Sequence, residues 1–214
     1  MADIKIFGEG SSKGGIFKKV RIFGQGRITT DINCDQIKVY GDGSFSGNAS
    51  VDQFTMFGSV SMKQSLNAQV VKVFGSLDVE ESLTCDKAKI KGFANVIGDI
   101  SLENLHVVGG LKVKGLLNAN QLTMNLQVAN SEINEIGGET ITIKSRSLNP
   151  FKPKHRLDVK VVEGDKIYLE HTVAAIVRGN EVTIGPNCEI KSVEYSTSLK
   201  KISTSQIDLE KKIN

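Results

Sequence analysis

The chain has no tryptophan, and it has only three prolines and three cysteines among its 214 residues. No apolar run approaches the roughly 18 residues of a membrane span, and the opening MADIKIFG lacks the apolar core of a signal peptide. A net charge of +3 without Lys/Arg runs argues against a nucleic-acid partner. We therefore expect a cytoplasmic protein with no direct membrane span, and any recruitment to the inner face of the membrane would go through a partner.

The few cysteines are Cys34, Cys85 and Cys188. An odd number of cysteines without a CxxC spacing argues against a disulfide framework and against a zinc site. We expect three buried free thiols.

What the chain does contain is a repeated five-residue phrase that ends in glycine. The copies IKIFG, VRIFG, IKVYG, FTMFG and VKVFG begin at positions 4, 20, 37, 54 and 71. The closing glycines of these and the later, weaker copies are Gly8, Gly24, Gly41, Gly58, Gly75, Gly92 and Gly109. The first step between them is 16 residues and every later step is 17, and a fixed period of this kind decides the architecture.

Each copy contains three short segments that alternate inward and outward, and each segment ends at a corner rich in Gly, Asn, Asp or Gln. Aligned by the repeat, the inward positions form uncharged columns. On the first strand these columns are Ile4, Val20, Ile37, Phe54, Val71, Ala88, Leu105, Leu122 and Ile6, Ile22, Val39, Met56, Val73, Ile90, Val107, Met124. One column of the third strand is Cys34, Val51, Ala68, Cys85, Leu102, Ala119.

Three strands per turn of 17 residues predict an all-β fold, a triangular parallel β-helix whose turns stack about 4.8 Å apart. Stacking is required, because one turn cannot bury its apolar face alone. We expect the residue missing from the first step to lie at a corner, where the length of the chain is easy to change.

The chain divides into three parts by its pattern. Residues 1–137 are predicted to form the main β-helix of about eight turns. Residues 138–156, which hold two of the three prolines, are predicted to form a segment that connects the two β-helical portions. Residues 157–214 are predicted to form a shorter, less regular β-helical portion with a terminal tail, and the sequence leaves open whether it continues the main helix or packs separately.

The aromatic residue before each glycine forms a column of its own, made of Phe7, Phe23, Tyr40, Phe57 and Phe74. Strict alternation points it outward, whereas a corner could rotate it inward. If it points outward, it is an apolar strip of the kind that marks a partner surface, and Phe23, Tyr40, Phe57 and Phe74 are then candidates for lateral contacts.

Two further outward columns are polar. A basic ladder on the first strand runs beside an acidic corner, which we interpret as charge compensation on a solvated face, with an electrostatic docking strip as the alternative. On the third strand the outward column is Asn33, Ser50, Asn67, Thr84, Ser101, Asn118. We expect hydrogen bonding along this ladder, with a flat lateral contact face as the alternative.

The repeat does not bring together side chains that could act in catalysis. The histidines are His106, His155 and His171, and none has a metal-ligand spacing or a nucleophile beside it. The stretch IGPNC at Ile184 is similar to hexapeptide-repeat acyltransferases, but steps of 6, 6 and 5 residues do not fit that family. We therefore expect no catalytic residue, no metal and no cofactor, and we keep an acyltransferase as a remote alternative to a protein that is not an enzyme.

The motif G-x-G-x-F-x-G-x-A at Gly41–Ala49, set on repeated [IV]-x-[IV]-x-G steps, and the C-terminal VRGNEVTIGPNCEIKSVEY resemble the bactofilins, a polymer-forming cytoskeletal family of bacteria. The C-terminal match is to the firmicute-type members, which carry a second β-helical portion. The resemblance implies a right-handed β-helix that polymerises end to end without nucleotide into cytoplasmic filaments and scaffolds other proteins. Many members carry a membrane-targeting N-terminal tail, whereas here Ile4 already occupies the first core column.

We therefore predict a self-assembling scaffold whose partners are further copies of itself and client proteins not identified by the sequence. Open strand edges at the end of a solenoid invite pairing, and nothing before Ile4 except Met1–Asp3 is available in the chain to cover the first turn. The self-assembly candidates are Ile4, Ile6, Phe7, Val193 and Ile202. The alternative is an adaptor that does not polymerise and binds a partner protein through a lateral face.

Overall fold

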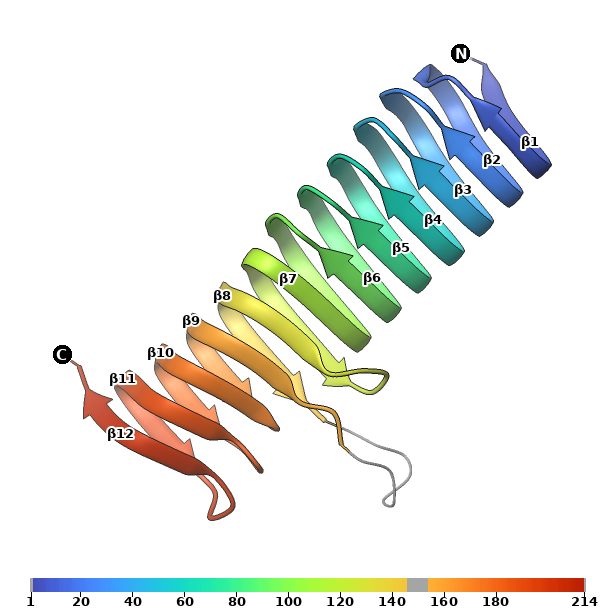
Figure 1. The fold of residues 1–214 in the computed structure, drawn as a ribbon. Coiled ribbons are helices and arrows are strands. Elements are labelled where there is room, and N and C mark those ends of the chain that lie inside the picture. Colours follow the sequence, from blue (N-terminus) through green and yellow to red (C-terminus); the bar gives the residue numbers. More distant parts are fainter. Residues whose placement is uncertain (1, 146–153, 214) are drawn as a thin grey trace.

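The computed structural model describes residues 2–145 and 154–213, and every regular element within them is a β-strand (Figure 1). The strands form one sheet in which each pairs in parallel with the next along the chain. This is the predicted parallel β-solenoid, with about twelve turns. The strands are β1 (Asp3–Ser12), β2 (Gly15–Ile28), β3 (Ile32–Phe45), β4 (Ala49–Met62), β5 (Leu66–Val79), β6 (Leu83–Val96), β7 (Ile100–Leu126), β8 (Ser131–Lys144), β9 (Leu157–Leu169), β10 (Thr172–Ile184), β11 (Glu189–Lys201) and β12 (Gln206–Lys212).

Each turn of the solenoid has three faces, which we name from the turn that spans β3 and β4. The first face is residues 37–39, the second face is residues 43–45 and the third face is residues 49–51. On each face the outer two residues point inward and are buried, while the middle residue points outward. The other turns take their faces from the register of the sheet.

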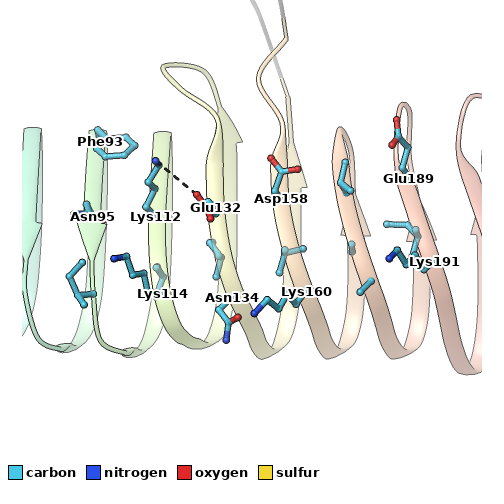
Figure 2. Close-up of a pocket in the computed structure, with 18 of the residues that line it drawn as sticks. Phe93, Asn95, Lys112, Lys114, Glu132, Asn134, Asp158, Lys160, Glu189 and Lys191 are labelled. Atoms are coloured by element: carbon cyan, nitrogen blue, oxygen red, sulfur yellow. Dashed lines mark ion pairs between the residues drawn. The ribbon is translucent and has the colours of Figure 1, made fainter.

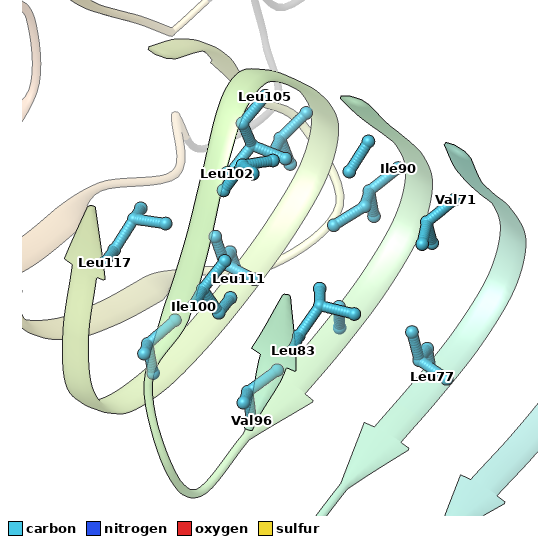
Figure 3. Packing of buried hydrophobic residues seen from close by; sticks show 14 of the residues in the cluster. Val71, Leu77, Leu83, Ile90, Val96, Ile100, Leu102, Leu105, Leu111 and Leu117 are labelled. Atoms are coloured by element: carbon cyan, nitrogen blue, oxygen red, sulfur yellow. The ribbon is translucent and has the colours of Figure 1, made fainter. Parts of the chain in front are cut away.

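The core is the set of inward columns that the repeat predicts (Figure 3). Val73 and Ile90 are fully buried on consecutive turns, and Leu77 fills the same interior from the second face. Because a residue stacks on its equivalent one turn away at about 4.8 Å, each apolar side chain of an interior turn is covered from both sides. Cys34 and Cys85 belong to one such column, three turns apart, and are free buried thiols as expected.

The repeated glycine is explained by the corner between the first and second faces. From Gly24 to Gly109 these glycines have φ between 113° and 148°, a region that residues with a β-carbon rarely adopt. A β-carbon on Gly41 would lie 2.3 Å from the carbonyl oxygen of Gly24. The repeat therefore keeps glycine because the backbones of successive turns touch at this corner.

The short first step lies at a corner, as predicted. β1 pairs with β2 at an offset of 16 residues up to Ser12, whereas Gly15 pairs with Ile32 at an offset of 17. The first turn passes the corner between its second and third faces with Lys13 and Gly14, where the next turn uses residues 29–31. The three-residue faces on either side of this corner keep their length.

The C-terminal portion continues the same sheet. β8 pairs with β9, with Ile133 opposite Val159, and the order continues without interruption to β12. The segment 138–156, expected to connect the two β-helical portions, is strand as far as Lys144, because residues 141–143 form the first face of another turn. Residues 146–153, including Pro150 and Pro153, lie outside the described residues.

The expected hydrogen-bonded ladder of the third face is not formed where the sequence placed it. From β1 to β7, the side-chain hydrogen bonds between equivalent positions lie at corners or on the second face, for example Gln36 Nε2 to Gln53 Oε1 at 3.3 Å and Asn95 Nδ2 to Asp78 Oδ1 at 3.1 Å. Among the described residues of the third face, such bonds occur only further along, where Arg178 donates to Glu163 and Glu194 on the two neighbouring turns. Side chains as short as those of Ser50 and Asn67 project from separate turns without meeting.

Candidate interaction surfaces

Within residues 2–145 and 154–213, no group of three or more His, Cys, Asp or Glu side chains could hold a metal ion. In the same residues, no helix is long and apolar enough to cross a membrane. The histidines are apart: His106 lies on the outward ladder of the first face, His155 lies just after the undescribed segment, and His171 lies at a corner.

His171 has a structural position. Its φ is 49°, its backbone N–H donates to the carbonyl oxygen of Pro186 at 2.9 Å, and its ring nitrogen Nε2 lies 3.3 Å from Nδ2 of Asn187. Burial of the imidazole, with a smaller effect of the Lys154 ammonium, lowers the pKa of His171. These contacts hold two successive corners together.

The three thiols are held in the protonated form by their surroundings. Burial raises the pKa of Cys34 to about 11, that of Cys85 to about 12 and that of Cys188 to about 11. Because the thiolate is the nucleophile and the metal ligand, these residues are placed as core side chains.

The N-terminal end of the solenoid is apolar. Ile4 and Ile6 point into the first turn and are 8% exposed, while Phe7 stands at the corner with 69% of its surface exposed. Among the described residues β1 pairs with β2 and with no other strand. The outer edge of β1 is therefore available for pairing.

The C-terminal end is built differently. Lys201 and Glu210 take inward positions, since they pair in the sheet with the buried residues Ile184 and Val193, and their side chains form an ion pair with each other. Charged side chains thus take the inward positions at this end, whereas at the N-terminal end these positions hold Ile4 and Ile6, and the exposed apolar side chain is Phe7.

The C-terminal assembly candidates therefore need a correction. Val193 is 0% exposed because β12 lies over it, so it cannot contact another molecule. Ile202 is 45% exposed and lies at the corner that Phe7 occupies at the other end. Leu209 of β12, which the sequence analysis missed, is 57% exposed nearby in the sequence.

The aromatic column points outward and its rings stack. Successive ring centroids from Phe7 to Phe74 lie 4.7–5.2 Å apart with interplanar angles of 3–5°. Lys91 continues the column, with its Nζ 5.9 Å from the centroid of Phe74. Because each ring covers the faces of its neighbours, the column offers ring edges along the side of the solenoid and one open ring face at Phe7.

A groove of about 890 Å³ follows the second face of the C-terminal turns (Figure 2). Two outward columns border it. We call one the carboxylate edge, formed by Glu132, Asp158 and Glu189, and the other the lysine edge, formed by Lys114, Lys160 and Lys191. Phe93 and Ile97 line the N-terminal end of the groove.

The two edges differ in how their charges are compensated. On the carboxylate edge, Glu132 lies 4.0 Å from Lys112 and Asp158 lies 3.1 Å from Arg156. On the lysine edge, no ammonium group forms an ion pair with any residue that the structure describes. Elsewhere on the solenoid, Arg178 bridges Glu163 and Glu194 at 3.1 and 2.8 Å and thereby lowers the pKa of Glu194.

Comparison with known proteins finds two relatives in Bacillus subtilis, both described as uncharacterized. The chain is 43% identical to YhbF over 99 residues, which cover 46% of this chain and 42% of YhbF. It is 42% identical to YhbE over 89 residues, which cover 40% of this chain and 38% of YhbE. The aligned regions thus span about two fifths of each relative. No family model matches the chain, and no solved structure matches it.

Proposed function

We propose that this protein is a structural scaffold that assembles with copies of itself through the ends of the solenoid. The observation that carries the proposal is the first turn, where β1 pairs on one side only among the residues that the structure describes and Phe7 is 69% exposed at the corner. A second molecule placed there would pair the free edge of β1 and bury Phe7. The resemblance to the bactofilins points in the same direction.

The contrast between the two ends favours contact between like ends. A head-to-tail contact would press the Lys201–Glu210 ion pair onto the aliphatic side chains of Ile4 and Ile6, and desolvating charge against apolar surface is costly. Contact between two N-terminal ends would instead bring together the exposed ring of Phe7 and the free edge of β1 from each copy. Such an isologous contact closes after two copies, so filament growth requires a second contact at the C-terminal end, for which Ile202 and Leu209 supply exposed apolar side chains.

No nucleotide is part of this proposal. Assembly by strand pairing and apolar burial is driven by the surfaces themselves. Negative-stain microscopy of the purified protein, prepared with and without added nucleotide, should show the same filaments in both samples. A sample that contains monomers at every concentration tested would contradict the proposal.

A second candidate function is that of an adaptor, and the groove on the second face favours it. A concave surface with an uncompensated row of lysines is suited to a ligand that lies along the solenoid. The groove runs along the side of the molecule (Figure 2) and reaches β12 at Gln206 and Asp208. It is separate from the contact at the N-terminal end, so a ligand in the groove and assembly through that end are compatible.

A further inference from the structure

The lysine edge has a period of its own. The register of the sheet pairs Val113, Ile133, Val159, Ala174 and Ile190 from β7 to β11, and it shifts by one residue directly after Val113. The residues that follow these five, and that form this edge, are Lys114, Asn134, Lys160, Ala175 and Lys191. A lysine therefore occurs on every second turn. Since turns are about 4.8 Å apart, the lysines recur at about 9.6 Å along the groove.

This spacing selects among the regular conformations of a peptide. A polyproline II helix has three residues per turn and a rise of about 3.1 Å per residue, so side chains on one of its faces recur at about 9.3 Å. In an extended β-strand, side chains on one side recur at about 6.6 Å. An α-helix about 10 Å wide returns to the same face every three or four residues, about 5.4 Å, and after two turns at about 10.8 Å. Polyproline II is the narrowest helix and the closest match.

The chemistry of the groove fits a peptide of this kind. The uncompensated lysines call for carboxylates on the facing side of the ligand. On the turn between Lys160 and Lys191, the edge positions are the apolar Val173 and Ala175, and Phe93 lies at the N-terminal end of the groove. Pyrrolidine rings pack well on apolar and aromatic side chains of this kind.

We propose that the groove of the second face binds a proline-rich peptide in the polyproline II conformation, with an acidic residue at every third position facing Lys114, Lys160 and Lys191. Glu132 and Asp158 of the carboxylate edge are already paired with Lys112 and Arg156, so only the side of the ligand that faces the lysine edge gains from carboxylates. The spacing of the charges and the direction in which they face therefore both matter. This inference concerns the side of the solenoid and does not depend on assembly through its ends.

The experiment measures the fluorescence anisotropy of a labelled peptide made of three Glu-Pro-Pro repeats. The matched control peptide has the same composition with its glutamates consecutive. The repeat peptide should bind about tenfold more tightly than the control, because each exposed ion pair contributes only a few-fold. Equal affinity for the two peptides, or no binding of the repeat peptide, overturns the proposal.

Two triple variants locate the site. Lys114→Gln/Lys160→Gln/Lys191→Gln should lose about tenfold in affinity for the repeat peptide. The variant Lys38→Gln/Lys72→Gln/Lys89→Gln removes the same charge from the first face and should bind as the parent does. Equal loss of affinity in both variants would mean non-specific attraction and would overturn the proposal. A change in the sedimentation of the groove variant without any peptide would also overturn it, since the occupant of the groove would then be a second copy of the chain.

Discussion

The carbonyl oxygen of Gly58 stands 2.0 Å from the point where a β-carbon on Gly75 would have to lie. Gly75 also has a φ of 137°. Space and backbone conformation thus both require glycine at this corner, and the requirement repeats on the turns from Gly24 to Gly109.

Gly75→Ala should therefore cost about 3 kcal/mol or more of stability, through backbone strain and displacement of the neighbouring turn. Gly8→Ala is the matched control, because a β-carbon there meets nothing within 4 Å and φ is 73°. We expect a cost of about 1–2 kcal/mol for it. Urea unfolding followed by circular dichroism measures both, and equal midpoints would contradict the contact between turns.

The core columns can be tested at neighbouring residues. Val73 is fully buried and Lys72 is exposed. Val73→Asp should lower stability by about 4 kcal/mol or more, since it places a charge without a partner in a closed apolar column. Lys72→Ser should change stability by less than about 0.5 kcal/mol. Thermal melts that show equal stability for the two variants would contradict the assignment of inward and outward positions.

His171 gives the protein a dependence of stability on pH. Its pKa in the folded protein lies below the ordinary value of 6.5, so the unfolded chain binds more protons between the two values. Stability should be complete above pH 6.5 and should fall as the pH drops from there toward the folded pKa. His171→Asn should remove this slope, because Asn tolerates a positive φ, whereas His106→Asn should retain it. Urea midpoints across pH 5–8 test this, and a slope that survives in His171→Asn would assign it to other groups.

The thiols provide a test of burial that is independent of stability. With pKa values raised to about 11–12, Cys34, Cys85 and Cys188 should not react with iodoacetamide at pH 8 in the folded protein. All three should react once the chain is unfolded in urea. Rapid alkylation of the folded protein at any of them, read by mass spectrometry, would show that its turn opens.

The sequence predicts the architecture well because every turn of a solenoid repeats the same alternation of inward and outward residues and the same corners. The inward columns, the corner glycines and the place of the missing residue all follow from the period, and the structure confirms each of them. Alternation also leaves little choice for Val73 or Ile90, since a shift by one residue would bury Lys72 or Lys89.

Two kinds of feature could not be predicted from the sequence, namely the direction of side chains at corners and the turns where the repeat changes its period. The direction of the aromatic column is set by the turn at Gly41, which alternation does not describe. The segment after Ile136 was read as a connection because its turn departs from the 17-residue step. The groove was missed for the same reason, since Lys114, Lys160 and Lys191 align only once the register of β7–β11 is known.

The sequence predicted one end of the solenoid correctly and the other incorrectly. The aliphatic first turn was read correctly from Ile4 and Ile6, because it obeys the period. The position of Val193 was misjudged, because the tail IDLEKKIN did not reveal that it adds β12 and covers the previous turn. The charged residues of that strand are the signal that it is a capped end.

Assembly through the N-terminal end is tested most directly by the pair Phe7→Arg and Phe57→Arg, examined by sedimentation velocity and negative-stain microscopy. Both residues belong to the aromatic column, but Phe7 is at the N-terminal end and Phe57 is inside the column, between Tyr40 and Phe74. With circular dichroism unchanged in both, Phe7→Arg should abolish filaments and leave monomers or dimers, while Phe57→Arg should assemble as the parent does. Normal filaments from Phe7→Arg, with assembly lost in Phe57→Arg, would contradict the end-to-end account and assign assembly to the side of the solenoid.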